Sequence, residues 1–180
     1  MSGSGRIHDR ELLDALEAIN PEKYDGETWR TTWASRDPLV GNQAGGRWNP
    51  PDSFEALYTS LEADGSLSET YYHLSKAPIF PSANVKLFRL HVVTENTLRL
   101  DQDALIDLGI DKTQIQRMDY ARSQEIGAAA HMLEFDSLLV PSARSAFLNL
   151  VLFLNRIDPG KLQAFEGKAI NWPAWKETRN

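Results

Sequence analysis

Cysteine is absent from the 180 residues of this chain. The absence excludes thiol catalysis and cysteine-based zinc or iron–sulfur sites, and it favours a reducing, intracellular location. The four histidines, His8, His73, His91 and His131, also lack the HxH or HExxH spacing that would bring two of them to one ion. We therefore expect no metal site.

Long apolar runs are absent as well. No segment approaches the roughly 20 uninterrupted apolar residues that span a bilayer. The first residues, MSGSGRIHDRELL, contain no apolar stretch of the kind that signal peptides carry. We therefore predict a cytoplasmic protein that makes no membrane contact.

Basic residues are outnumbered. The chain has 19 lysines and arginines against 25 aspartates and glutamates, which gives a formal net charge of −6. Proteins that follow a nucleic-acid backbone draw most of their affinity from clustered basic residues, so we expect no direct nucleic-acid binding. Two or three converging arginines would still bind a small anionic ligand, because bidentate guanidinium contacts fit the geometry of phosphate.

Motifs of several common enzyme classes are missing too. No predicted strand leads into a GxGxxG or GxxxxGK[ST] loop, which excludes Rossmann and P-loop nucleotide sites, and no GxSxG elbow indicates a serine hydrolase. Internal repeats and linkers rich in proline, serine or glycine are also absent. With 42% hydrophobic residues, we predict one domain over residues 1–180 with a core of its own.

The chain does contain a mixture of helical and strand patterns. Leucines at helical spacing predict an amphipathic N-terminal helix at about residues 9–19. Further helices are predicted at about 66–76, 103–109 and 121–134, and strands at TWRTTW, EALYTS, VKLFRLHVV, DSLLV and AFLNLVLFL. Because several strands follow one another with no helix between them, we predict an α+β fold of mainly antiparallel sheets with flanking helices.

The stretch GGRWNPP, residues 45–51, places a cation and a large aromatic ring between two glycines and two prolines. The glycines give backbone freedom just before this pair, and the prolines fix the backbone just after it. Arg47 is therefore expected to be held in one place. Two interpretations remain open: a structural cation–π contact that braces the loop, and a contact to a ligand.

Glu69 closely follows the predicted strand EALYTS, within SLSETYYHL. One interpretation is structural: residues 66–69 match a capping box, in which Ser66 caps the helix and Glu69 bonds back to its amide. The other is catalytic: Glu69 would point into a cleft beside Arg47. There a carboxylate can bind a sugar hydroxyl and stabilise a developing oxocarbenium ion.

Other polar residues also have a structural interpretation. Arg30, in TWRTTW, is either a solvated edge residue or a second phosphate contact, and Tyr58, in EALYTS, is either a core residue or a platform for a ligand. Turn chemistry explains Ser142, in PSAR after DSLLV. Asn149 interrupts the apolar run AFLNLVLFL, and a buried amide there needs a partner, such as a neighbouring loop.

The order of these motifs resembles one known family. WRTTWAS, GGRWNPP, ALYTS, the helix with Glu69, SQEIGAAA, and LLVPSAR followed by an asparagine in an apolar strand are together closely similar to the RES domain. The resemblance covers about residues 28–155, and GGRWNPP with LLVPSA is a specific pair. The Arg, Glu and Ser of the family's name match Arg47, Glu69 and Ser142. Asp52 departs from the pattern, because family members often have glycine after the prolines.

The resemblance implies a toxin of a bacterial toxin–antitoxin pair, with a fold similar to ADP-ribosyltransferases and with NAD as its substrate. Some members of the family degrade NAD by hydrolysis or phosphorolysis, and others transfer ADP-ribose to a protein. The partner that the resemblance implies is an Xre-type DNA-binding antitoxin that covers the active site.

The resemblance also implies roles for individual residues. Arg30 and Arg47 would hold the pyrophosphate or ribose, Tyr58 would stack near the nicotinamide, and Ser142 would position the dinucleotide. Glu69 would hold the nicotinamide ribose and stabilise positive charge as the N-glycosidic bond breaks. No metal is required, because nicotinamide in NAD is already a cationic leaving group. The rival hypothesis is a non-catalytic nucleotide-binding or protein-interaction module that keeps the same cleft.

Overall fold

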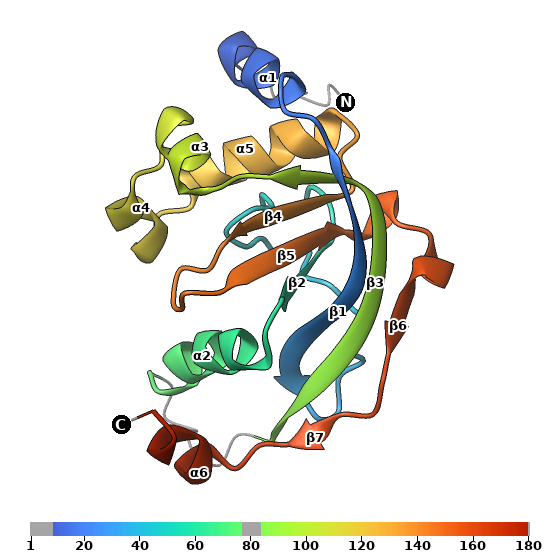
Figure 1. Cartoon of the computed structure of the whole chain (residues 1–180), viewed down its shortest axis with the longest axis vertical. Helices are drawn as coiled ribbons and strands as arrows, with labels where there is room; N and C mark the ends of the chain where they lie inside the picture. The colour runs from blue at the N-terminus through green and yellow to red at the C-terminus, as the bar shows by residue number, and fades with distance from the viewer. Residues whose placement is uncertain (1–8, 77–83, 180) are drawn as a thin grey trace.

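The computed structural model describes residues 9–76 and 84–179, and a seven-stranded sheet forms its centre. The strands are β1 (Glu22–Trp33), β2 (Ala56–Ser60), β3 (Val85–Arg99), β4 (Ser137–Pro141), β5 (Leu148–Phe153), β6 (Leu162–Ala164) and β7 (Lys168–Ala169). Their order is β1-β2-β5-β4-β3-β6, and β7 also pairs with β3. β3 and β4 are parallel, whereas the other paired strands are antiparallel. With helices around this sheet, the predicted α+β class is confirmed (Figure 1).

The long strands β1 and β3 form a curved ribbon along one side of the molecule (Figure 1). β1 also pairs with β2, where Trp29 lies opposite Ser60. The pairing of β1 with β3 therefore joins the two ends of the path β1-β2-β5-β4-β3. The sheet therefore closes on itself through β1, β2, β5, β4 and β3. Backbone groups at the edges of these strands are hydrogen-bonded within the sheet and are not available to pair with other chains.

Each predicted strand is present, but two of them are longer than their apolar patterns indicated. β1 begins at Glu22 rather than at Thr28, and β3 continues to Arg99 rather than ending at Val93. The added part of β1 has the sequence EKYDGE, which lacks an alternating apolar pattern. Cross-strand ion pairs with β3 take the place of that pattern in this part of the ribbon.

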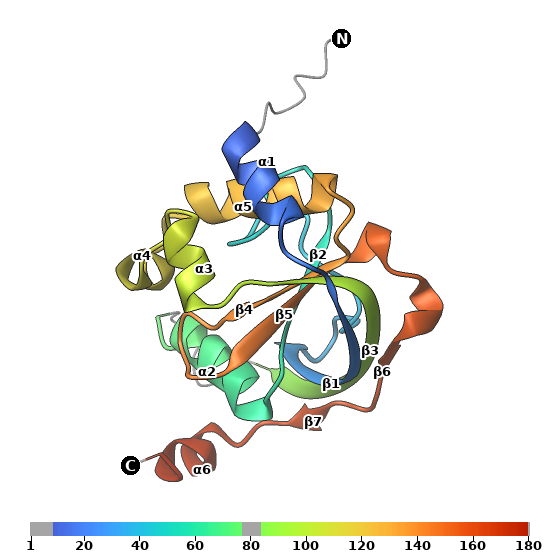
Figure 2. The same ribbon diagram turned by 45° about the horizontal axis from the view of Figure 1, so that its top comes forward.

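The four predicted helices are also present, as α1 (Arg10–Glu17), α2 (Ala63–Leu74), α3 (Gln102–Asp107) and α5 (Ala121–Met132). α1 lies across α5 and buries Leu12 and Leu16 (Figure 2), so this helix packs on the fold itself. An additional short helix, α4 (Lys112–Gln116), was not predicted. It begins at a capping box formed by Asp111 and Gln114.

The capping box predicted for residues 66–69 is wrong. α2 begins three residues earlier, with Glu62 at its N-cap, so Ser66 lies inside the helix. The Ser66 hydroxyl instead contacts the Thr31 hydroxyl of β1, at 2.9 Å. Asp64 explains the earlier start, because an acid in the first turn complements the helix dipole and Asp64 also accepts a hydrogen bond from the Trp175 indole. Glu69 is therefore free of any capping role.

The segment after residue 155, for which we made no prediction, contributes several short elements. They are the 3₁₀ turns η1 (Leu154–Arg156) and η2 (Pro159–Lys161), the strands β6 and β7, and helix α6 (Trp172–Glu177). Trp172 of α6 is buried in a small cluster with Leu67 and Leu74 of α2. The C-terminal segment thus supports the helix that carries Glu69.

Apolar side chains fill both faces of the middle strands. On β4, Leu138 and Val140 pack in the cluster that contains Leu16 of α1 and Ile126 of α5, whereas Leu139 packs in a second cluster. Neighbouring residues of a strand point to opposite faces, so burial on both faces explains the uninterrupted apolar run of β4. No helix among the described residues is long and apolar enough to cross a bilayer.

Candidate functional site

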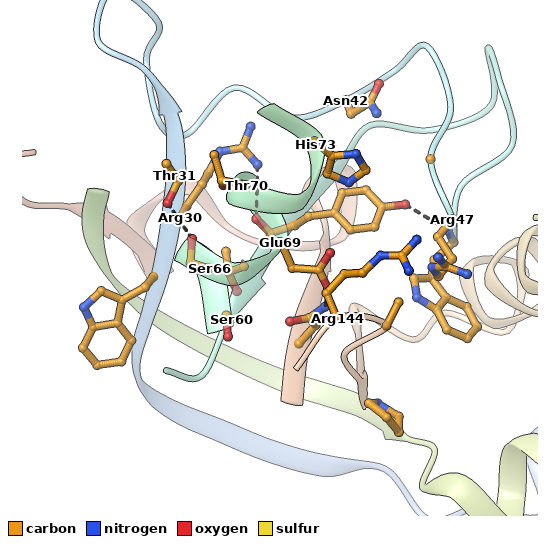
Figure 3. Close-up of a pocket in the computed structure, with 18 of the residues that line it drawn as sticks. Arg30, Thr31, Asn42, Arg47, Ser60, Ser66, Glu69, Thr70, His73 and Arg144 are labelled. Carbon is orange, nitrogen blue, oxygen red and sulfur yellow. Dashed lines mark hydrogen bonds between the residues drawn. The ribbon is translucent and has the colours of Figure 1, made fainter. Parts of the chain in front are cut away.

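A cavity of about 390 Å³ lies between α2 and the glycine–proline loop. Its walls come from β1, the loop that begins near Asn42, β2, α2, Tyr120 and the connection between β4 and β5. Arg30, Arg47 and Glu69 all line it (Figure 3). Segments far apart in the sequence therefore meet at one cleft.

The glycine–proline loop is fixed by an internal hydrogen-bond network around Asn49, which is fully buried. The Asn49 amide donates to the backbone oxygens of Asn42 and Phe54, at 2.8 and 3.2 Å. Its side-chain oxygen accepts from the Tyr58 hydroxyl at 2.6 Å, and that hydroxyl accepts from the Trp48 backbone amide at 2.9 Å. Burial raises the pKa of Tyr58, which keeps this phenol neutral. The loop next to Arg47 is thus held on the inside.

Two residues of this loop have left-handed backbone conformations. Gly45 has φ of 103° and Asp52 has φ of 55°. The second value lies in the region that glycine reaches without a steric penalty, which fits the glycine that the family resemblance led us to expect after the prolines. Aspartate is among the non-glycine residues that tolerate it best, so the departure at Asp52 is compatible with the same turn.

Helix α5 holds the loop from the outside. The backbone oxygen of Trp48 lies so close to Gly127 that a Cβ atom there would approach it to 1.7 Å. One turn earlier, the Gln124 amide donates to the Gly46 oxygen at 2.8 Å. Trp48 itself is buried in the core and also forms part of the cleft wall. These contacts give the SQEIGAAA motif a physical role, which the sequence alone did not reveal.

The Arg47 guanidinium lies at the mouth of the cleft. It sits over the Tyr120 ring, 4.6 Å from the centroid, and donates to the Arg117 backbone oxygen at 3.4 and 3.5 Å. Burial lowers the pKa of Arg47, and the charge of Glu69 acts in the opposite direction. The predicted cation–π contact therefore exists, but it leaves the guanidinium without a carboxylate partner among the described residues.

Glu69 projects from α2 into the same cleft, toward the β4–β5 connection (Figure 3). The Ser142 hydroxyl donates to its Oε1 at 2.6 Å, and the Asn149 amide lies at 3.4 Å from the same oxygen. Asn149 therefore contacts the glutamate rather than a loop, which corrects our first interpretation. Its own Oδ1 is buried with no protein partner in the described part of the chain. Two donors orient the carboxylate, which remains exposed to the cleft through its other atoms.

Arg30 and Ser142 are placed differently from Arg47 and Glu69. Both ends of the Arg30 guanidinium donate to backbone oxygens, those of Tyr58 at 3.2 Å and Val40 at 3.1 Å. Burial lowers the pKa of Arg30 to about 10, and Arg36 adds to the effect. Arg30 is thus neither a solvated edge residue nor a fully free cation. Ser142 is buried and meets the cleft through Glu69.

Sequence reasoning missed two further residues of the cleft, His73 and Arg144. His73 lies one helical turn after Glu69, and a carboxylate–histidine pair at this spacing was a detectable signal for a shared helix face. Burial lowers the pKa of His73, Glu69 opposes this change and Arg144 reinforces it. Arg144 stacks over the Tyr72 ring at 3.6 Å, and it directly follows the LLVPSA motif.

Acidic and histidine side chains do not gather into a metal site in the described ranges. No group of three or more of them there is placed to hold an ion. The polar chemistry of the cleft consists instead of guanidinium, carboxylate, hydroxyl, amide and imidazole groups.

Comparison with known proteins identifies a family for this chain. The RES domain family matches residues 22–173, a wider span than the 28–155 that the motifs indicated. The NAD(+) phosphorylases MbcT of Mycobacterium bovis and Mycobacterium tuberculosis are each 28% identical to this chain, over 95% of it and 96% of their own length.

A solved structure is similar as well. The match is to the M. tuberculosis MbcT–MbcA toxin–antitoxin complex, with a TM-score of 0.82, 28% identity, and coverage of 95% of this chain and 98% of the other. The family match extends over most of the sequence and includes Arg47, Glu69 and Ser142. This chain belongs to the RES domain family.

Proposed function

We propose that this protein is the toxin of a bacterial toxin–antitoxin pair and that it consumes NAD by breaking the nicotinamide N-glycosidic bond. The single observation that carries the proposal is the shared cleft of Arg47 and Glu69, in which an oriented carboxylate and a guanidinium with no carboxylate partner among the described residues line one cavity. The relatives named NAD(+) phosphorylase support NAD as the substrate.

In the proposed mechanism the residues bind and orient the dinucleotide and stabilise charge. Arg47 contacts the pyrophosphate, because a guanidinium without a carboxylate partner can offer paired donors to phosphate oxygens. Glu69 holds the nicotinamide ribose and stabilises the oxocarbenium-like centre as the bond breaks. Ser142 fixes the carboxylate through its 2.6 Å hydrogen bond and thereby positions it for the dinucleotide.

Arg30 and Tyr58 have more restricted roles in this proposal. Two of the Arg30 donors are already used by backbone oxygens, so Arg30 contacts the dinucleotide with those that remain. The Tyr58 hydroxyl is used within the loop, so the ring face is the part of Tyr58 that packs near the nicotinamide. We also propose that the fold around this site is similar to that of the ADP-ribosyltransferases.

The nature of the leaving group explains why such a cleft suffices. Nicotinamide departs from NAD as a neutral molecule, since the electron pair of the broken bond neutralises its pyridinium ring. The protein has to fix the dinucleotide, stabilise positive charge on the ribose and admit an acceptor. We propose inorganic phosphate as that acceptor, because the relatives are named phosphorylases and because three arginines, Arg30, Arg47 and Arg144, line the cleft. Water and a protein side chain are the rival acceptors.

We further propose that a cognate antitoxin of the Xre DNA-binding type neutralises the protein by covering the cleft. The similarity to a toxin–antitoxin complex supports a protein partner. A cover over the cleft would block entry of NAD to Arg47 and Glu69, both of which line the cavity. The NAD pool of the cytoplasm is the place where such a toxin would act.

Release of free nicotinamide from NAD by the purified protein tests the enzymatic proposal. We expect release that increases with inorganic phosphate and yields a phosphorylated ADP-ribose. Labelled NAD separates the rivals, because transfer to a protein leaves label on a macromolecule and hydrolysis yields ADP-ribose without phosphate dependence. Absence of nicotinamide release with NAD, with phosphate and with cell extract would contradict the proposal.

Growth measurements separate the toxin from a non-catalytic binding module. Induced expression of the wild-type chain should arrest growth and lower cellular NAD, and Arg47→Ala should relieve both effects. A binding module would lower NAD in neither case.

A further inference from the structure

A second cavity, of about 540 Å³, opens beside the first. Pro141, Ala143 and Arg144 line both cavities, so the β4–β5 connection is the shared wall. The remaining walls of the second cavity come from Tyr72 of α2 and from residues of α3 and α4. The proposed mechanism uses the first cavity for the dinucleotide and gives the second one no role.

The second cavity is cationic although the whole chain is acidic. Lys112 and Arg144 line it, and no aspartate or glutamate is among the described residues of its lining. The hydroxyls of Ser142 and Ser145 and the amide of Gln116 provide neutral hydrogen-bonding groups around these charges. In a chain with a net charge of −6, such a lining favours a small anion.

Arg144 lies at the boundary of the two cavities, and its contacts leave its hydrogen-bond donors largely unused. Its guanidinium stacks over the Tyr72 ring at 3.6 Å, and its Nη2 lies 4.0 Å from the Met118 sulfur, which is a weak acceptor. No carboxylate of the described residues lies within ion-pair distance of it. A stacked guanidinium keeps its edge free for a planar, bidentate contact to an oxyanion.

Arg144 is also tied to the reacting centre through the backbone. Its amide donates to the Ser142 hydroxyl at 3.1 Å, and that hydroxyl donates to Glu69 at 2.6 Å. An anion bound by the Arg144 side chain would therefore lie at the boundary between its own cavity and the carboxylate that holds the ribose.

We propose that Arg144 and Lys112 form a subsite for inorganic phosphate, through which the acceptor reaches the ribose from the second cavity while NAD occupies the first. This inference depends on the proposed function. An oxygen of hydrogen phosphate dianion forms the bond to ribose C1, and the C1–N bond breaks with its electron pair going to nicotinamide. The dianion keeps its proton during the step, so the product phosphate is a monoanion that then loses this proton to solvent. No general base is required, which fits an acceptor subsite built from cations.

NAD itself contains phosphate groups, so the experiment has to distinguish binding of inorganic phosphate by Arg144 from binding of the NAD pyrophosphate by the same residue. Initial rates of nicotinamide release are measured against phosphate at saturating NAD, and against NAD at saturating phosphate, at constant ionic strength. For Arg144→Gln we expect the KM for phosphate to rise about tenfold or more, with the KM for NAD changed less than about twofold, since charge-assisted hydrogen bonds are lost to phosphate alone. Lys112→Gln should show a smaller rise of the same kind.

Two variants serve as controls. Arg144→Lys keeps the charge but not the bidentate geometry, so its KM for phosphate should lie between those of wild type and Arg144→Gln. Arg99→Gln removes an arginine that pairs with Glu22 on the outer ribbon, at 3.8 Å, and should leave both KM values unchanged. Circular dichroism establishes that each variant is folded.

The outcomes are distinct. A rise in the KM for NAD instead of phosphate would show that Arg144 binds the pyrophosphate and would overturn the subsite, as would unchanged values of both constants. Calorimetric titration with inorganic phosphate, with chloride as the matched salt, tests the subsite without catalysis. Binding that disappears in Arg144→Gln supports the subsite even if the wild-type protein releases no nicotinamide, a result that would refute the proposed function alone. Equal binding by both proteins, or no binding by either, overturns the subsite.

Discussion

Two regions of this molecule use basic side chains in opposite ways. Along the outer β1–β3 ribbon, Lys23 and Arg89 each pair with a carboxylate on the neighbouring strand. Around the cleft, Arg47 and Arg144 have no carboxylate within ion-pair distance in the described part of the chain. They rest instead on aromatic rings, at 4.6 and 3.6 Å from the centroids.

The difference shows that net charge does not describe the functional surface of this protein. The ribbon uses opposite charges to hold two exposed strands together, and its cations are neutralised by the fold. In the cleft, burial is the main cause that lowers the pKa of Arg47; Arg144 adds to this effect, and Tyr120 and Glu69 oppose it. A partly buried guanidinium with no carboxylate partner favours an anion, which is the physical basis for proposing that Arg47 binds the NAD pyrophosphate and that Arg144 binds inorganic phosphate.

The largest expected effect comes from the carboxylate of the cleft. Glu69→Gln keeps the size of the side chain but removes the charge that stabilises the oxocarbenium-like centre, so we expect kcat for NAD cleavage to fall about 100-fold or more. Thermal unfolding should change little, because Glu69 has no capping role in α2. A variant that unfolds while its folded fraction stays fully active would show that Glu69 is structural.

Arg47→Gln should have the next largest effect. Loss of a charged contact to the pyrophosphate should raise the KM for NAD about tenfold or more. The matched change on the ribbon, Arg89→Gln, removes the ion pair with Glu27 and should leave steady-state kinetics as they are. If the two substitutions changed the KM for NAD equally, the proposed difference between the cleft arginines and the ribbon arginines would be wrong.

Gly127→Ala tests whether the position of Arg47 depends on the contact between α5 and the loop. A methyl group at residue 127 would meet the Trp48 backbone oxygen at 1.7 Å, so the loop or the helix has to move. Overpacking of this kind destabilises by about 1–3 kcal/mol or more, and Tm should fall by about 5 °C. Gly160→Ala is the control, because its nearest contact would be an ordinary 3.4 Å. A rise in the KM for NAD in Gly127→Ala alone would link loop position to binding.

The smallest effect is expected on the ribbon, at Glu95. Hydrogen bonds from Lys23 and Lys161 lower the pKa of Glu95 from 4.5 to about 2. A carboxyl with a lowered pKa in the folded state adds stability above pH 4.5 that is lost as the pH falls toward 2. The Tm difference between wild type and Glu95→Gln should therefore be largest near neutral pH and shrink across that range. Because the group is exposed, salt should also reduce the difference.

Local patterns predicted the elements whose apolar residues follow a helix or strand period. The strands β1 to β5 and the helices α1, α2, α3 and α5 belong to this group, whereas β6 and β7 were not predicted. The patterns failed where cross-strand charge pairs replace apolar alternation, as in residues 22–27, and where a helix is too short for a period, as in α4. The capping box at Ser66 failed because Ser66 binds Thr31 of a distant strand, a contact that no local pattern encodes.

The sequence by itself determined the family resemblance, the stiff GGRWNPP loop and the candidate residues Arg47, Glu69 and Ser142, because these are properties of residue type and local order. Only the tertiary structure decided how they act together. The hydrogen bond from Ser142 to Glu69 joins residues 73 positions apart, and the stacking of Arg144 on Tyr72 joins the same two segments. Such contacts form only when the sheet folds and β1 pairs with β3. The free energy that stabilises this arrangement comes from packing throughout the core, and no single sequence motif determines it.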